Sequence, residues 1–572
     1  MTGWRRLCSA LLLGAAMWML FTWPLAKQFS RAIPWTGDRA GGATVQELVP
    51  GDHLQLLYHF WLMRDMLAGH TPWFANVYEF NLGDDAARIE SGAYYAPFSL
   101  VYAALAGWGG DAWGWNGTGL IAILVAAWGL LALARRHVES EGLAFAVAAV
   151  ALATPYAWTT LLGGSPTGFG MALVPWLAWG LDVAVRDGRV RGGVVAAVAL
   201  VAAAGADLHT FYFSVLFAPV LLCLSAGWGR ADGRCQPSWS QRLRALWPLA
   251  VGGLLIAAFA AWTHQQLAES TVAGGRTWAE MKLFSPAGKG FVWAHAPGMS
   301  RHLYLGVAWF VLVGLSGWAF VRENRRAAVG SRRWPVLLLF VLLGGVLLLA
   351  WGAHGPLDGV ILKLARKTLP RFVMIRQSVK VYCLLPTIMV LLLARTLPAL
   401  QRWRWGNVLI VALVVLVLID SRRAFAPGLC RLPRQMPAYE AVAADATEKD
   451  ALPHALALPL WPGDSHESSR YEYAAMLSRV RLVNGYSPVI PPGYREAVVV
   501  PLSPLNQGEL GPAEVQRLRE LRVGYLIVHA DAFGAARDVP DAATVLARLQ
   551  TNPHLKLLAQ HESQWAFELL PE

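Results

Sequence analysis

Charged residues are scarce in this sequence. They make up 15% of the 572 residues, whereas 56% are hydrophobic, a balance that excludes an ordinary soluble enzyme. Several runs of about 18 or more nearly uncharged residues are long enough, as helices, to cross the roughly 30 Å hydrocarbon layer of a bilayer. The composition therefore predicts an α-helical polytopic membrane protein and excludes the cytosolic, secreted and disordered classes.

Cysteine is rarer still, and familiar soluble-enzyme motifs are missing. None of the five cysteines belongs to a CxxC pair or a Cys/His cluster, so neither a zinc site nor a disulfide framework is indicated. The polar C-terminal part contains no nucleophile elbow and no phosphate loop. The net charge of +12 is not accompanied by a Lys/Arg run interleaved with aromatic residues, so we expect no nucleic-acid partner.

Eleven apolar segments are predicted to span the membrane. They lie near residues 8–26, 114–134, 142–160, 167–185, 190–206, 209–227, 245–264, 303–321, 334–352, 378–396 and 406–420. The first segment is too long for a signal peptide and lacks an A-x-A-like exit, so we expect it to be retained. Alternation from a cytoplasmic N-terminus places five arginine-rich loops, the first at Arg135 and Arg136, in the cytoplasm, as the positive-inside rule requires.

This topology divides the chain into two parts. Residues 1–420 form a transmembrane domain with a long first extracytoplasmic loop at 29–113, which we call the first loop. Because such a loop far exceeds the usual connection length, it must carry structure or function of its own. Residues 421–572 alternate short strands and helices, which predicts a small extracytoplasmic α/β domain.

The first loop contains a candidate catalytic carboxylate. Asp52 follows Pro-Gly at the start of a mostly apolar stretch, and it shares one helical face with Gln55 and His59. One interpretation is a helix N-cap, a common role for aspartate before an apolar periodic run. The other is a general base aimed at a substrate at the membrane boundary. Asp38 and Glu47 are second choices in the same loop.

Cations and an ionisable pair mark other outer boundaries. The segment around 353–380 places Arg371, Arg376 and Lys380 outside, against the charge rule that the other loops obey. The segment is either an ordinary solvated face, a topology error, or a site in which Arg376 and its neighbours bind a phosphate. Asp207 and His209 lie where two spans meet, either as a helix cap with its neighbour or as part of a site.

Several segments resemble one family of enzymes. PGDHLQLLYHFWLMRDMLAGHTPWFANVYEFNLG resembles the first-loop signature of bacterial multi-pass glycosyltransferases of the GT-C class. The likeness continues in order through GGSPTGFG and the paired helices after it, HLYLGVAWFVLVGL, LPRFVMIRQSVKVYCLLP, and VRLVNGYSPVIPP followed by LRELRVGYLIVHADAF. It covers most of the chain and therefore favours a GT-C-like fold with its C-terminal domain.

The resemblance implies a reaction and a place for it. It implies transfer of a sugar from a polyprenyl-phosphate-linked donor to a glycan, lipid or protein acceptor, at the outer face of the bacterial inner membrane. The catalytic base of the first loop falls on Asp52, with inversion in a single displacement. His53 stands where some members carry a second acidic residue, so dependence on a divalent cation, Mg²⁺ or Mn²⁺, is left open and no metal ligands are assigned. The candidate site residues are Asp52 as base, Arg376, Arg371 and Lys380 for the donor phosphate, and Asp38, His53, Gln55, His59, Asp207 and His209 in support.

Two other classes of protein stay open. One is a polytopic transporter or a flippase for lipid-linked sugars, and the other is a non-catalytic relative of the glycosyltransferases. Transporters usually show inverted repeats and ionisable groups at mid-membrane. This sequence shows no convincing internal repeat, and its charged groups gather at one boundary.

Overall fold

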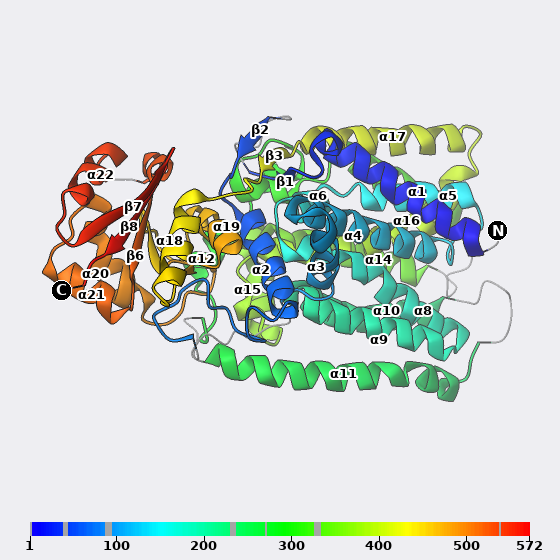
Figure 1. The fold of residues 1–572 in the computed structure, drawn as a ribbon. Helices are drawn as coiled ribbons and strands as arrows, with labels where there is room; N and C mark the ends of the chain where they lie inside the picture. Colours follow the sequence, from blue (N-terminus) through cyan, green and yellow to red (C-terminus); the bar gives the residue numbers. More distant parts are fainter. Residues whose placement is uncertain are drawn as a thin grey trace.

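The chain forms a bundle of long helices with a sheet-containing domain at one end (Figure 1). The computed structural model describes residues 3–37, 44–85, 94–228, 236–268, 272–324, 333–536 and 539–571. The N-terminus lies at the end of the bundle opposite the C-terminal domain (Figure 1). One end of the long axis therefore holds the N-terminus, and the other end holds the C-terminal domain.

All eleven predicted segments form helices. Their bounds are α1 Gly3–Thr22, α4 Asp111–Ala134, α5 Glu141–Leu152 with α6 Pro155–Leu162, α7 Pro166–Gly170 with α8 Val174–Asp187, α9 Val190–Ala206, α10 Leu208–Gly227, α11 Trp239–Ala268, α13 Val307–Asn324, α14 Trp334–Trp351, α16 Leu385–Gln401 and α17 Gly406–Ala424. Helices α5 and α6 meet at a 52° bend, at which Pro155 starts a new helix instead of continuing the old one.

The predicted spans differ in length and apolar character. In the described part of the chain, eight helices are long and apolar enough to cross a membrane, or nine if the α5–α6 pair is one span. Helix α9 has only 17 residues, and α17 ends with Asp420, Arg422 and Arg423, which reduce its apolar character. Both helices nevertheless run along the bundle (Figure 1).

Described arginines of the arginine-rich loops lie at the end of the bundle that holds the N-terminus. Arg135 donates to the Ser9 hydroxyl, 2.7 Å away, and so ties the end of α4 to the start of α1. Arg395 lies 2.8 Å from the ring of His137, which links the last turns of α16 to the loop after α4. The charge pattern read from the sequence therefore corresponds to one physical end of the molecule.

The first loop folds into short strands and two helices. These are β1 Ala32–Trp35, β2 Val45–Glu47, α2 Asp52–Leu67 and α3 Phe98–Gly109. Helix α2 occurs where the sequence predicts it. Helix α3 starts directly after Pro97, because proline disfavours helical geometry in the residue before it. Strand β3, Gly428–Arg431, pairs antiparallel with β1 and parallel with β2, so the chain after the bundle joins the first loop in one sheet.

The C-terminal domain is a mixed sheet with helices, as predicted. Its strands are β4 His454–Leu458, β5 Arg481–Leu482, β6 Tyr525–His529, β7 Leu555–His561 and β8 Gln564–Leu569, in the order β5-β4-β6-β8-β7. Strands β5, β4 and β6 are parallel to one another, and β8 pairs antiparallel with both β6 and β7. Its main helices are α18 Pro437–Glu448, α19 Ser469–Ser478, α21 Pro512–Glu520 and α22 Ala542–Gln550.

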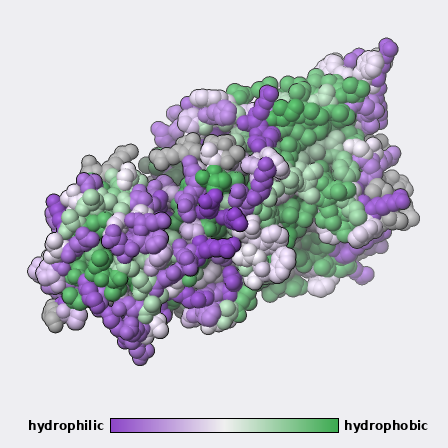
Figure 2. Space-filling model, turned by 45° about the horizontal axis from the view of Figure 1, so that its top comes forward, coloured by the Kyte–Doolittle hydropathy of each residue, from purple (hydrophilic) through white to green (hydrophobic). Residues whose placement is uncertain are grey.

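Shorter elements complete the end of the bundle next to the C-terminal domain. They are α12 Trp278–Leu283, α15 Pro356–Thr368 and the 3-10 turns η7 Phe372–Met374 and η8 Ser378–Leu384. In surface view, hydrophobic residues cover the bundle and hydrophilic residues cover the C-terminal domain (Figure 2). The α/β domain and the helical bundle therefore face different solvents, as their compositions require.

Candidate active site

Asp52 is the first residue of α2, and its side chain does not cap that helix. The N-cap residue is Gly51, and no side chain caps the helix start. The Asp52 carboxylate instead accepts a hydrogen bond, 2.5 Å long, from the hydroxyl of Tyr486 in the C-terminal domain. The N-cap interpretation of Asp52 is therefore wrong, and its side chain is exposed beside the C-terminal domain.

Tyr486 belongs to a segment after β5, Asn484–Pro488, which we call the strap. The backbone N–H of Tyr486 donates to the buried carboxylates of Glu472, at 2.8 Å, and Glu79, at 3.2 Å. Its carbonyl accepts from the side-chain amide of Gln55. Burial and the neighbouring Asp52 raise the pKa of Tyr486, so its hydroxyl remains a donor.

The predicted polar face of α2 supports the strap. Gln55 bonds to the strap directly, and the ring of His59 lies 2.8 Å from the Gln55 carbonyl and 3.8 Å from the Glu79 carboxylate. His53 is buried beside Trp35, and burial lowers the pKa of His53 to about 3. His53 is therefore neutral and cannot serve as a cationic partner of Asp52.

A second group of charges lies where α9 ends and α10 begins. Asp207 caps α10, accepting from the N–H of Thr210 at 2.9 Å, and also lies 3.2 Å from the ring of His209. Lys380 places its ammonium group 3.4 Å from the same ring nitrogen. Lys380 interacts electrostatically with Asp207, Arg376 and Asp52. The capping interpretation of Asp207 is thus confirmed, and the same carboxylate also belongs to a charge cluster.

Arg376 stacks its guanidinium 4.2 Å from the centre of the Phe284 ring. It interacts electrostatically with both Lys380 and Tyr486. Arg371 differs from it, because its side chain is exposed and makes no hydrogen bond or ion pair within the described residues. Electrostatic interactions therefore link Arg376 and Lys380 to the group around Asp52, and none within the described residues links Arg371 to it.

Arg276 is a site residue that sequence reasoning missed. Its guanidinium donates to the Pro488 carbonyl of the strap at 3.0 Å and to Glu280 at 2.9 Å. Its backbone N–H donates to the Val373 carbonyl, 2.8 Å away, just before Arg376. Tyr486 was missed as well, although it lies in the NGYSP segment that carries part of the family resemblance. Asp38 lies outside the described residues, and Glu47 is exposed on β2.

The described residues of this cluster do not form a site for a divalent cation. No group of three or more His, Cys, Asp or Glu side chains in the described ranges could hold a metal ion. Asp52 faces a tyrosine hydroxyl and a lysine, and Asp207 is already engaged by Thr210 and His209. A hard cation prefers several free oxygen ligands, which this donor set lacks.

Close glycine packing fixes where the two helix starts lie. Gly164, in the turn between α6 and α7, has a φ of +83°, and a Cβ there would lie 2.2 Å from the Cα of His53. A Cβ on Gly170 would lie 3.2 Å from the Cβ of Asp207. The GGSPTGFG segment therefore packs against the starts of both α2 and α10, and so positions Asp52 relative to Asp207.

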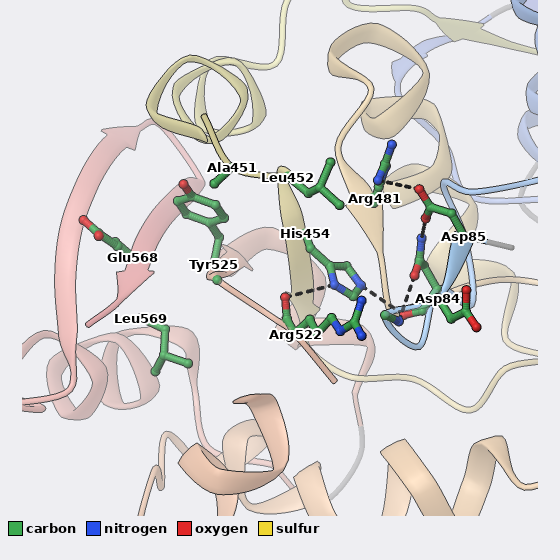
Figure 3. Close-up of a pocket in the computed structure, with 13 residues that line it drawn as sticks. Asp84, Asp85, Ala451, Leu452, His454, Arg481, Arg522, Tyr525, Glu568 and Leu569 are labelled. Carbon is green, nitrogen blue, oxygen red and sulfur yellow. Dashed lines mark hydrogen bonds and ion pairs between the residues drawn. The ribbon is translucent and has the colours of Figure 1, made fainter. Parts of the chain in front are cut away.

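A cavity of about 520 Å³ lies elsewhere, between residues 81–85 of the first loop and the C-terminal sheet (Figure 3). In its wall, His454 places its two ring nitrogens 3.0 Å from the carbonyl oxygens of Asn81 and Arg522. Arg481 pairs with Asp85 at 2.5 Å. None of the predicted site residues lines this cavity, and its contacts join the first loop to the C-terminal domain.

Comparison with known proteins supports the fold. No family model matches the sequence, and no curated protein is similar to it. The arabinofuranosyltransferase AftD from Mycobacteria superposes with a TM-score of 0.60 and 15% identity, covering 98% of this chain and 40% of that one. A mutant of AftD gives 0.57 and 17%, with coverages of 98% and 41%. The chain has the fold of a GT-C glycosyltransferase.

A more distant similarity is found with the archaeal oligosaccharyltransferase AglB from Archaeoglobus fulgidus. Its TM-score is 0.48 at 9% identity, covering 92% of this chain and 69% of that one. The fold assignment therefore rests on the AftD structures, of whose length this chain spans about two fifths. The predicted fold class, a polytopic helical membrane protein with a small C-terminal α/β domain, is confirmed.

Gly164→Ala is expected to destabilise the protein by about 3 kcal/mol, because the added methyl group meets the backbone of α2 and the residue has a positive φ. Thermal unfolding in detergent measures this loss. Gly253→Ala in α11, where a Cβ meets nothing within 4 Å, is the control and should be neutral or slightly stabilising. Equal melting temperatures for Gly164→Ala and wild type would contradict the packing argument.

Proposed function

We propose that the protein is an integral membrane glycosyltransferase that moves a sugar from a polyprenyl-phosphate-linked donor to an acceptor hydroxyl. One observation carries the proposal. Asp52, from the first loop, interacts electrostatically with Lys380, and Arg376 interacts with both Lys380 and Tyr486, the hydrogen-bond partner of Asp52, although both cations are more than three hundred positions away in sequence. A carboxylate that accepts a proton, beside cations that bind phosphate, suits transfer from a phosphate leaving group.

The proposed reaction is a single displacement. Asp52 accepts the proton of the acceptor hydroxyl while the oxygen of that hydroxyl attacks the anomeric carbon of the donor. The bond from that carbon to the phosphate oxygen breaks, and its electron pair remains on the polyprenyl phosphate. Lys380, Arg376 and Arg276 would stabilise the negative charge that develops on this leaving group. Attack opposite the phosphate inverts the anomeric centre.

An apolar groove supports a lipid-linked donor. The groove, about 620 Å³ in volume, lies between α3, α9 and α11 and is lined by side chains such as Leu100, Val198 and Trp247. One end is formed by Gly205, two residues before Asp207, and another part by Ala96, next to Tyr95, whose ring packs against His59. An isoprenoid chain in this groove would have its phosphate end close to the cation cluster.

Arg376→Met is expected to raise the KM for the lipid-linked donor by about tenfold or more, because a charge-assisted contact to phosphate is lost. Steady-state transfer with a radiolabelled polyprenyl-phosphate-sugar pool measures it. Lys367→Met, an exposed cation on α15, is the control and should leave the KM unchanged. Arg371→Met tests another predicted phosphate-binding cation, and we expect it to raise the KM less than Arg376→Met does. An unchanged KM for Arg376→Met would remove Arg376 from the phosphate site.

Asp52→Asn is expected to reduce sugar transfer by about 10²- to 10⁴-fold in membranes with matched protein amounts, because the amide cannot accept the acceptor proton. Transfer from a radiolabelled polyprenyl-phosphate-sugar pool is the measurement. The control is Asp541→Asn, at the N-cap of α22, where asparagine also caps a helix. Undiminished transfer by Asp52→Asn would refute the base assignment. Movement of the lipid-linked sugar across vesicles without any transfer would favour the flippase alternative.

The proposed site faces outward from the bacterial inner membrane, with the N-terminus in the cytoplasm. The arginine-rich loops lie at the opposite end from Asp52, and the positive-inside rule places that end in the cytoplasm. A lipid-linked donor agrees with this orientation, because nucleotide sugars are confined to the cytoplasm.

Cysteine labelling tests the orientation. In a background without native cysteines, Lys556→Cys in the C-terminal domain is expected to react with an impermeant maleimide in intact cells of a bacterial expression host. Arg191→Cys, at the opposite end of the bundle, should react only after permeabilisation. Both positions are exposed in the structure, so burial does not protect either one. The reverse pattern would contradict the orientation.

A further inference from the structure

The strap is held by contacts on both sides of Tyr486. The side chain of Asn484 bonds to the N–H of Ala457 at 2.6 Å and to its carbonyl at 2.9 Å, on the neighbouring strand β4. The N–H of Ser487 donates to the Gly463 carbonyl at 2.9 Å. Beyond it, the Pro488 carbonyl accepts from Arg276. The backbone on which Tyr486 stands is therefore fixed by the sheet and by the membrane domain.

Residues of the first loop also bond to the backbone of Tyr486. Gln55, on α2 one turn after Asp52, donates to the Tyr486 carbonyl, and Glu79 accepts from its N–H. The Asp52 side chain is exposed and makes no other hydrogen bond within the described residues. A carboxylate at an exposed helix start otherwise rotates among several rotamers. The hydrogen bond from Tyr486 is thus the contact that orients it.

The two carboxylate oxygens of Asp52 differ as a result. Oδ1 accepts from the Tyr486 hydroxyl, and Oδ2 has no hydrogen-bond partner in the described part of the chain. A base must lie within hydrogen-bond reach of the proton that it accepts, and small misplacements can reduce rates about 10²-fold. Holding one oxygen leaves the other in a defined position for an acceptor hydroxyl.

We propose that Tyr486 is a positioning residue that orients the Asp52 carboxylate, so that the C-terminal domain completes the active site. The inference rests on the proposed function, since it assigns Asp52 the role of base. The proposal also assigns a role in catalysis to the C-terminal domain. The domain supplies the hydroxyl, and its sheet and the strap contacts fix where that hydroxyl stands.

The first test is kinetic. Tyr486→Phe retains the ring and removes only the hydroxyl, so kcat for sugar transfer is expected to fall about tenfold while the KM for the polyprenyl-phosphate-sugar pool stays within twofold of wild type. Tyr525→Phe is the matched control, because it removes another tyrosine–carboxylate bond of the same domain, 2.9 Å to Asp445. Its kcat should equal that of wild type. Unchanged kcat in Tyr486→Phe, or an equal fall in both variants, would overturn the proposal.

The second test needs no activity. Melting temperatures of the protein in detergent are measured for wild type, Tyr486→Phe, Asp52→Ala, which removes the accepting carboxylate, and the double variant. If the hydroxyl and the carboxylate are bonded, the double variant should lose less than the sum of the two single losses. Additive losses would overturn the proposal whether or not the protein transfers sugar. Non-additive losses in a protein without transfer would instead refute the proposed function and leave the contact established.

Discussion

The arrangement of this protein depends on the cost of placing charge in hydrocarbon. Ionisable side chains are expensive within a bilayer, so they collect where helices end, and the two ends of the bundle acquire different chemistries. At one end, Arg135 and Arg395 bond to residues of neighbouring loops and helices. At the other, Asp207, Lys380 and Asp52 come together. The segregation of charge along the bundle axis is what makes a polar reaction site possible in a chain with so few charges.

An ion pair and a small sheet account for how distant parts of the chain dock at this end. Asp65 on α2 is buried, and Arg479, before β5, donates to it at 2.8 Å and 3.0 Å. A buried carboxylate requires such a partner, because an unpaired one would be strongly destabilising. The sheet β1-β3-β2 adds backbone pairing between the first loop and the chain that leaves the bundle. Together these contacts place the C-terminal domain on α2.

The docking has a chemical consequence, because α2 carries the candidate base on its first turn. The same helix that presents Asp52 supplies Gln55 to the strap and Asp65 to Arg479. A shift of the C-terminal domain would therefore move the tyrosine hydroxyl relative to the carboxylate. In the proposed mechanism the domain is therefore part of the site, and its contacts are distributed along α2 at Asp52, Gln55 and Asp65.

Much of this could be predicted from the sequence, because it depends on local composition. The apolar segments, the amphipathic helix at Asp52, the alternating strands and helices after Asp420, and the charge of each loop are properties of neighbouring residues. The predicted spans are least clear at α9 and α17, where length or terminal charge is marginal. The cap interpretation of Asp52 failed because Gly51 takes that position. The tertiary structure alone decided that Tyr486 bonds to Asp52, that Lys380 interacts with Asp52 electrostatically and that Arg276 bonds to the strap, since no local pattern encodes contacts between residues hundreds of positions apart.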